Sequence, residues 1–189
     1  MTQELRTGRL WLRGWTEADR APYAALNADP AVMEYFPSTL TAPQSDEMVA
    51  RMQAGLDQRG YGLWATERLD TGECIGFVGV AMPTWEVEGL TPCVEIGWRL
   101  ARQHWGQGFA PEAASEVLRF AFEHIELPRD EVVSFTTVTN HRSRRVMEKI
   151  GLTVDPRREF DHPMTPGWWG LRHVVYCIDR PTWKAGVAR

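Results

Sequence analysis

A glycine-bearing turn in the middle of the chain has the residue types and spacing of an anion-binding site. It reads Gln103-His-Trp-Gly-Gln-Gly-Phe-Ala-Pro111. Gly106 and Gly108 lack the Cβ atoms that would keep an oxyanion away from the backbone. A helix with Pro111 at its first position would aim unpaired N–H groups and the positive end of its dipole at the same place. The turn therefore predicts a pyrophosphate site.

A strand must lead into this turn, and a helix must lead out of it. The run Cys93–Leu100 is strand-like, and residues 111–125 place small and apolar side chains at helical spacing. The face of that helix expected in the core carries Ala114, Val117, Leu118, Ala121 and Ile125. A β-prone run at Val132–Thr139 and a helix between Asn140 and Gly151 follow. The turn thus belongs to a strand–helix–strand–helix order.

Further strands and helices surround this centre. The sequence pattern predicts strands over residues 9–15, 61–69, 74–82, 153–162 and 174–179. Helices are expected over residues 17–28, with Thr16 as the cap, and 41–60, with Gly60 as the stop. This order implies one mixed α/β sheet with helices on both faces.

Composition limits the class of protein. The chain has 189 residues with 43% hydrophobic content, which fits a single domain over residues 1–189. A net charge of −4 and a pI near 5.8 argue against a nucleic-acid partner. The three cysteines show no ligand spacing, so we expect no metal and a cytoplasmic protein with reduced thiols. No run of apolar residues is long enough to predict a membrane partner.

The ordered motifs resemble those of the GNAT superfamily of N-acetyltransferases. They are the strand Cys93–Leu100, the turn Gln103-x-x-Gly106-x-Gly108, and Asn140-x-x-Ser143-x-x-Val146-Met-Glu-Lys-Ile-Gly151. The set is most similar to the RimJ/RimL type, whose named members acetylate the N-termini of ribosomal proteins. The resemblance implies a mostly antiparallel twisted sheet of about six to seven strands, with about four flanking helices. It also implies a splayed parallel pair, Cys93–Leu100 and Val132–Asn140.

The resemblance further implies an acetyl-CoA site at that splayed pair. It assigns the pyrophosphate to the turn, the pantetheine arm to the strand backbone before it, and the thiol end to Asn140. Asn140 has a second interpretation as a plain helix N-cap. The cofactor-binding residues expected on this basis are Trp98, Arg99, Leu100, Gln103, Trp105, Gly106, Gln107, Gly108, Phe109, Ala110, Asn140, Ser143 and Arg145.

The chain departs from the family at the usual general acid. Many members carry a tyrosine seven residues after the asparagine, where this chain has Met147. RimL-type members use a serine three residues after it, and Ser143 fits that position. The competing interpretation of Ser143 is an exposed serine in the first turn of a helix. A thiolate leaving group has a pKa of about 8.5, so acid assistance need not be large.

A base is also needed, because the acceptor amine must lose its proton before it attacks the thioester. Glu95 is the leading candidate, since it alternates with Ile96 and would face away from the core. The N–H near Gly97 would hold the oxyanion. The alternative interpretation of Glu95 is a structural carboxylate that forms a salt bridge on the strand. His162 is a weaker candidate base.

Several other residues have two interpretations. Arg142, Arg145 and Lys149 share one helical face, which is either a solvated face or an attractor for the cofactor's 3′-phosphate. The loop tryptophans, Trp168 and Trp169, either roof the acceptor site or pack in the core. The pair Tyr35 and Phe36 could line the same acceptor pocket.

Three functions are compatible with parts of the sequence. The first is transfer of acetyl from acetyl-CoA to a primary amine, on a protein N-terminus or a small molecule, by direct attack in a ternary complex. The second is a silent CoA-binding module, which Met147 alone supports. The third, a dinucleotide-dependent oxidoreductase, lacks the glycine or alanine that its fingerprint needs where Pro111 stands. The acidic pI favours a cationic acceptor, and the resemblance allows a homodimer.

Overall fold

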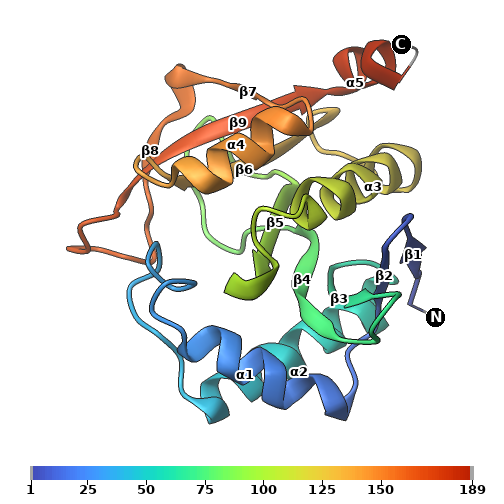
Figure 1. Cartoon of the computed structure of the whole chain (residues 1–189). Helices are drawn as coiled ribbons and strands as arrows, with labels where there is room; N and C mark the ends of the chain where they lie inside the picture. Colours follow the sequence, from blue (N-terminus) through green and yellow to red (C-terminus); the bar gives the residue numbers. More distant parts are fainter. Residues whose placement is uncertain (1, 188–189) are drawn as a thin grey trace. The chain divides into compact units, whose positions relative to one another are not determined.

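The computed structural model describes residues 2–187 (Figure 1). Its strands are β1 (Leu5–Arg6), β2 (Leu10–Arg13), β3 (Leu63–Arg68), β4 (Cys74–Ala81), β5 (Glu95–Leu100), β6 (Glu131–Thr137), β7 (Thr153–Val154), β8 (Phe160–Asp161) and β9 (Arg172–Asp179). Its helices are α1 (Arg20–Ala28), α2 (Ala42–Arg59), α3 (Phe109–His124), α4 (His141–Lys149) and α5 (Arg180–Val187). None of the helices among these residues is long and apolar enough to cross a bilayer.

The strands form one mixed sheet in the order β1-β2-β3-β4-β5-β6-β9-β7, with β8 paired to β9. Pairing is antiparallel for β1–β2, β2–β3, β3–β4, β6–β9, β7–β9 and β8–β9. It is parallel for β5–β6, at the single register pair Glu95 and Val133. The mixed, mostly antiparallel sheet with a parallel pair is thereby confirmed. The strand count exceeds the prediction because β1, β7 and β8 have only two residues each.

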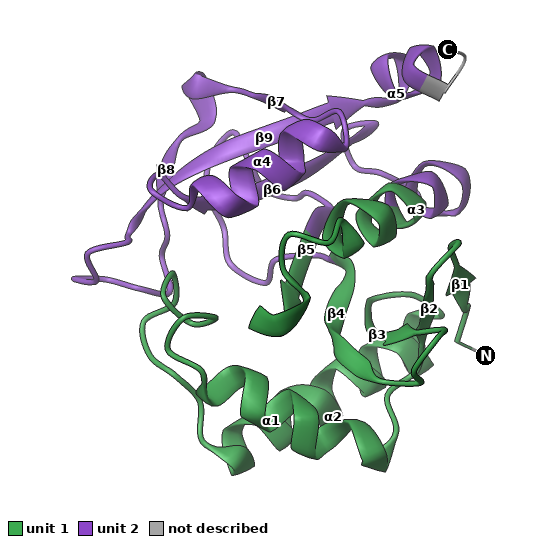
Figure 2. Ribbon diagram, in the orientation of Figure 1, with its two compact units in different colours: residues 1–80, 97–117 green, residues 81–96, 118–189 purple. Residues whose placement is uncertain are grey.

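Contacts divide the chain into two compact units (Figure 2). Unit 1 comprises residues 1–80 and 97–117, and unit 2 comprises residues 81–96 and 118–189. The boundaries fall inside β5 and α3 and at the last residue of β4, so these elements contribute to both units. The single domain over residues 1–189 stays a prediction.

Unit 1 packs α1 against α2, and α2 against β3. The helix α2 begins and ends as predicted: Thr41 accepts a hydrogen bond from the Gln44 N–H, and Gly60 closes the helix in a left-handed conformation. Helix α1 begins later than predicted, because Glu17–Asp19 form a 3-10 turn before it. The buried faces of these elements place Leu12, Tyr23, Leu56 and Trp64 in the core.

Unit 2 is built on the antiparallel pair β6 and β9, which run in register from Glu131 and Asp179 to Thr137 and His173. Helix α4 packs on β6, and α5 packs on β9. A core cluster is formed by Leu90, Cys93, Val133, Phe160 and Val175, with Trp85, Val87, Phe135 and Cys177 packed against it.

The predicted strand over residues 153–162 is confirmed only near its two ends. The short strands β7 and β8 flank a 3-10 turn at Pro156–Arg158. Pro156 has no N–H to donate to a sheet, and the Asp155 carboxylate accepts a hydrogen bond from the Arg157 N–H, which favours a turn. The sequence pattern also missed β1 and α5. In α5, Pro181 reads as a breaker, although proline is tolerated in the first turn of a helix.

Candidate active site

The glycine turn in unit 1 has the geometry of an anion cradle. Gly106 and Gly108 adopt φ values of 74° and 81°, in the left-handed region that favours glycine. A Cβ built on Gly106 would meet no atom within 4 Å, so the backbone there borders open space. Helix α3 begins at Phe109, two residues earlier than predicted, so Pro111 is its third residue. The unpaired N–H groups of this first turn therefore follow Gly108 directly.

Side-chain hydrogen bonds hold the turn in shape. The Trp105 indole N–H donates to the Leu100 carbonyl oxygen at 2.8 Å. The Gln107 amide donates to the Gln103 carbonyl oxygen at 2.9 Å. Buried His104 lies edge-on to Phe109 and 3.2 Å from Glu73. These bonds fix the turn, and open space borders Gly106.

Sequence reasoning missed a residue that braces the turn, Arg9. Its guanidinium donates to the Gln107 carbonyl oxygen at 3.0 Å and to the Glu112 carboxylate at 2.6 Å. It also lies 4.5 Å from the ring centroid of Phe109. Burial alone would raise the pKa of Glu112, but hydrogen bonds from Thr7 and Arg9 lower it below its usual value. The Glu112 carboxylate is therefore ionised and holds Arg9 in place. No motif connects residue 9 with residue 107, so only the fold reveals this contact.

In unit 2, Asn140 caps α4. Its side-chain oxygen accepts a hydrogen bond from the Ser143 N–H at 3.1 Å, and its amide nitrogen donates to the Thr136 hydroxyl at 2.9 Å. The N-cap interpretation is therefore confirmed, and cofactor contact by Asn140 stays a prediction. Ser143 is half-buried in the first turn of α4. The cap binds its backbone N–H, and its hydroxyl makes no hydrogen bond with the residues that the structure describes.

The position of the family's tyrosine is closed to chemistry in this chain. Met147 lies in the core of unit 2, with 1% of its surface exposed. The buried hydroxyl of Tyr176 is engaged between the guanidinium of Arg144 and the carboxylate of Glu148. Neither residue offers a free acid, so Ser143 is the remaining hydroxyl candidate on α4.

Glu95 is half-buried at the β5 residue that pairs with β6, while its neighbour Ile96 is fully buried. Burial raises the pKa of Glu95 to about 8. Within residues 2–187 the carboxylate forms no ion pair, so the salt-bridged interpretation is wrong. A carboxylate with this pKa is a stronger base than an ordinary glutamate, and its proton affinity suits transfer near neutral pH.

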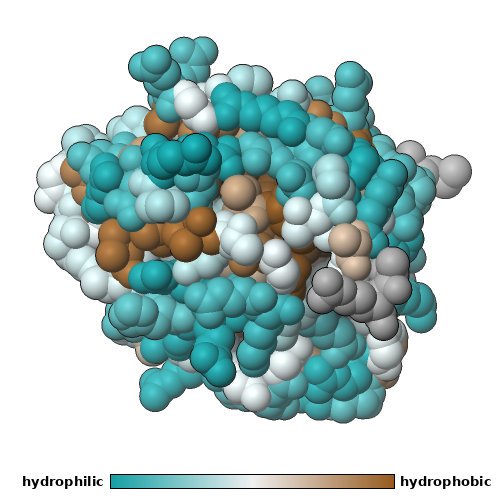
Figure 3. Space-filling view, turned by 90° about the horizontal axis from the view of Figure 1, so that it is seen from above, coloured by the Kyte–Doolittle hydropathy of each residue, from teal (hydrophilic) through white to brown (hydrophobic). Residues whose placement is uncertain are grey.

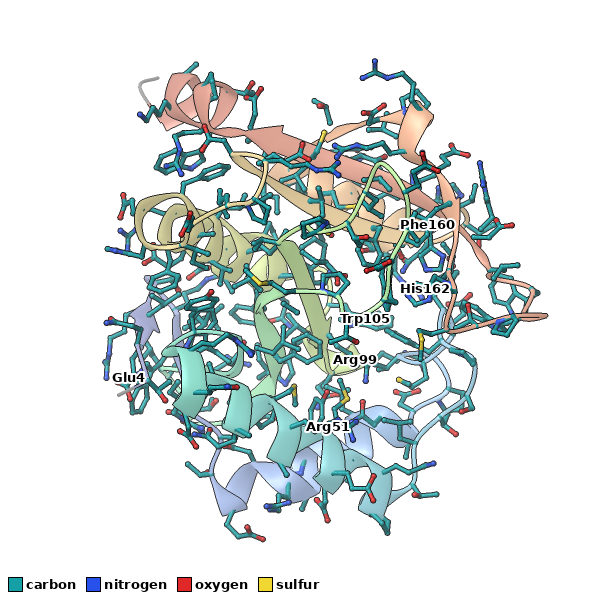
Figure 4. All side chains as sticks on the ribbon, turned by 180° about the vertical axis from the view of Figure 1, so that it is seen from behind. Glu4, Arg51, Arg99, Trp105, Phe160 and His162 are labelled. Atoms are coloured by element: carbon teal, nitrogen blue, oxygen red, sulfur yellow. The ribbon has the colours of Figure 1, made fainter. Side chains whose placement is uncertain are left out.

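The weaker candidate base, His162, belongs to an aromatic cluster in unit 2. Figure 4 shows it close to Phe160, and its ring centroid lies 5.0 Å from those of both Trp85 and His173. Burial, with a smaller effect of His173, lowers the pKa of His162 to about 4. Its Nδ1 accepts a hydrogen bond from the Met164 N–H. His162 is therefore neutral near pH 7, and that nitrogen is occupied.

The remaining residues with two interpretations are mostly at the surface. Arg142, Arg145 and Lys149 are exposed on α4. Trp168 is half-buried and Trp169 is 64% exposed, so core packing is wrong for Trp169. One face of the molecule shows hydrophobic surface set among hydrophilic side chains (Figure 3). No group of three or more metal-ligating side chains occurs in the described part of the chain.

Comparison with known proteins is consistent with this geometry. A family model described as an acetyltransferase (GNAT) domain matches residues 9–153. The uncharacterized protein YkkB of Bacillus subtilis (strain 168) is 35% identical over 152 residues, which cover 79% of this chain and 84% of that protein. The FsC-acetyl coenzyme A-N(2)-transacetylase of Aspergillus fumigatus is 34% identical over 187 residues, which cover 95% of this chain and 77% of that protein.

Solved structures share the fold. An acetyltransferase from Agrobacterium tumefaciens is similar with a TM-score of 0.75 and 30% identity, over 95% of this chain and 96% of that one. The spermidine N-acetyltransferase of Vibrio cholerae, solved with CoA and spermine, is similar with a TM-score of 0.71 over 94% of this chain and 99% of that one. At 17% identity, the second likeness shows the fold alone.

Proposed function

Because the chain belongs to the GNAT acetyltransferase family, we propose that it transfers an acetyl group from acetyl-CoA to a primary amine in a ternary complex. The observation that carries this proposal is the glycine turn at the start of α3, with two left-handed glycines and open space at Gly106. That arrangement suits the pyrophosphate of the donor. Gln103, Trp105, Gln107, Phe109 and Ala110 frame it.

The donor's other contacts follow the family pattern. The pantetheine arm pairs with the β5 backbone at Trp98–Leu100, and Asn140 and Arg145 contact the cofactor from α4. Support for the strand contact comes from the pairing of β5 with β6, which has one register pair, at Glu95. Beyond that pair, the β5 backbone keeps donors and acceptors that another extended group can use.

The chemistry needs one proton acceptor and one oxyanion donor. Glu95 takes a proton from the acceptor ammonium, directly or through a water. The neutral nitrogen attacks the thioester carbon, and a backbone N–H near Gly97 stabilises the oxyanion. The carbon–sulfur bond then breaks, and the attached nitrogen releases its second proton to solvent. The thiolate receives a proton directly from solvent or through the Ser143 hydroxyl, which solvent then reprotonates. The products are an N-acetylated amine and CoA.

A screen of amines tests this function. Thiol release from acetyl-CoA is measured with N-terminal peptides, amino acids and polyamines, so that both the protein N-terminus of the RimJ/RimL type and small acceptors are covered. We expect release with at least one class. CoA binding in calorimetry without release for any amine would establish the silent module instead.

Replacement of Ser143 by alanine tests the acid. We expect about tenfold lower kcat at pH 7 and a smaller loss at pH 9, because a thiolate with a pKa of about 8.5 needs less help in alkaline solution. Ser115→Ala is the matched control, since Ser115 is an exposed serine on α3. Equal rates for Ser143→Ala and wild type at both pH values would show that Ser143 is only a first-turn residue.

A further inference from the structure

Unit 1 contains a buried cation that no carboxylate accompanies. Arg99, on β5, is 8% exposed. Its Nη1 donates to the amide oxygen of Asn27 at 2.7 Å and approaches the sulfur of Met48. Within residues 2–187 it forms no ion pair with an aspartate or glutamate. Burial lowers the pKa of Arg99, with only Tyr23 acting in the opposite direction.

A second buried arginine of the same unit, Arg13, does have carboxylates that compensate its charge. Arg13 is equally buried, at 8% exposed, and its guanidinium lies 2.7 Å from both the Asp19 and the Glu67 carboxylates. The hydrogen bond with Asp19, reinforced by Glu67, raises the pKa of Arg13. Burial of an unpaired charge is costly, and an apolar residue of similar size would fill the space at lower cost. The carboxylates that stabilise the buried charge of Arg13 therefore have no counterpart at Arg99.

One N–H of the buried Arg99 guanidinium has no hydrogen-bond partner. Nη1 donates to Asn27, and the Tyr23 hydroxyl also interacts with the guanidinium, whereas Nε is fully buried without a hydrogen-bond partner. Nε and Nη2 form one edge of the planar group, which can donate two parallel hydrogen bonds to a carboxylate.

The surroundings fix this edge and supply no anion. Asn27 is held by a hydrogen bond from its amide nitrogen to the Ser45 hydroxyl at 2.9 Å, which directs its oxygen to Arg99. The ring centroid of Phe36 lies 4.1 Å from the guanidinium carbon. Arg99 contacts none of the residues that brace the glycine turn, so this feature is separate from the pyrophosphate cradle.

We propose that the Arg99 side chain binds a carboxylate of the acceptor, so that the substrate is an amino acid or peptide that carries both the reacting amine and a carboxylate. This inference rests on the proposed acetyl transfer. It is compatible with the role of the Arg99 backbone in cofactor pairing, because strand side chains project from the sheet while the backbone groups lie in its plane. Because the Asn27 amide is neutral, it does not compensate the positive charge of Arg99, which stays available to such a ligand.

The experiment compares acceptors that differ only in the anion. We measure kcat/KM for alanine against alaninamide and for Ala-Ala against its C-terminal amide. For each acceptor pair, the ratio of kcat/KM for the acid to kcat/KM for the amide is compared between wild type and variants. Differences in the intrinsic reactivity of the two amines then cancel. Arg99→Met and Asn27→Asp should each lower that ratio by roughly ten- to hundredfold, the factor of one charge-assisted hydrogen bond. Asn27→Asp retains the arginine and supplies an internal counter-ion.

The control is Arg51→Met, which removes the same charge from the exposed face of α2 (Figure 4) and should keep the ratio. An unchanged ratio in Asn27→Asp would overturn the proposal, even where Arg99→Met fails to fold. Phosphoethanolamine and ethanolamine form a second pair, and selectivity for the phosphate alone would also overturn it.

A final arm separates this inference from the proposed function. Absence of thiol release with every amine would contradict acetyl transfer. In that case, calorimetry with N-acetylalanine and N-acetylalaninamide still decides the role of Arg99. Tighter binding of the acid by wild type, lost in Asn27→Asp, supports the anion site, and equal binding of the two compounds refutes it.

Discussion

Glu95→Gln is expected to lower kcat by about 10²- to 10⁴-fold, the range for loss of a general base. Burial raises the pKa of Glu95 to about 8, and only the ionised form can accept the proton of the acceptor. Wild-type kcat should therefore rise with pH through an apparent pKa near 8, which a pH–rate profile measures. The glutamine variant should lack this inflection, because its amide does not titrate.

The same substitution is expected to stabilise the protein in alkaline solution. The pKa of Glu95 is about 8 in the folded chain against a reference value of 4.5, so between these values the folded state holds a proton that the unfolded state has released. Stability from this group is present below pH 4.5 and is lost as pH rises through 8. With allowance for the half-buried side chain, Glu95→Gln should gain about 2 kcal/mol at pH 9, or roughly 4–8 °C in Tm.

Thermal unfolding at pH 4.5 and pH 9 provides the comparison. Glu88→Gln is the matched control, since it makes the same chemical change at an exposed position of the loop before β5, and neither its kcat nor its Tm should change. A variant at Glu95 that keeps wild-type turnover across pH would show that the base is elsewhere. A gain in stability at pH 4.5 as large as that at pH 9 would contradict the raised pKa.

Local patterns were sufficient for the elements whose ends are set by nearby residues. Helix α2 begins at its Thr41 cap and ends at Gly60 because both signals act through hydrogen bonds within one turn. The strand–turn–helix around Gly106 and Gly108 was predicted for the same reason, since left-handed φ values are a local demand. The buried face of α3 also follows from spacing alone.

Properties that depend on distant residues could not be predicted in this way. The contact of Arg9 with the turn joins residues about a hundred positions apart in sequence. The carboxylate of Glu95 was expected either as a base or in a salt bridge, and the choice depends on burial by the fold. Arg99 was assigned only through its backbone, because its lack of a counter-ion is a property of the packed unit.

Gly108→Val is expected to weaken CoA binding at least about hundredfold in calorimetry. Gly108 has φ of 81°, where a β-branched residue is strained, and a Cβ would lie 3.4 Å from the Arg9 guanidinium that braces the turn. Relief of that strain must move the N–H groups at the start of α3. Loss of even one or two charge-assisted hydrogen bonds, at about 1.5–3 kcal/mol each, accounts for this factor.

Backbone strain by itself must be separated from loss of the cradle. Gly89, in the loop before β5, has a similar φ of 76°, and a Cβ there would meet no atom within 4 Å. Gly89→Val therefore imposes comparable strain away from the turn, and it should lower Tm while CoA binding persists. If Gly89→Val abolishes binding as completely as Gly108→Val, general destabilisation explains both results. If Gly108→Val binds CoA normally, the pyrophosphate is held elsewhere.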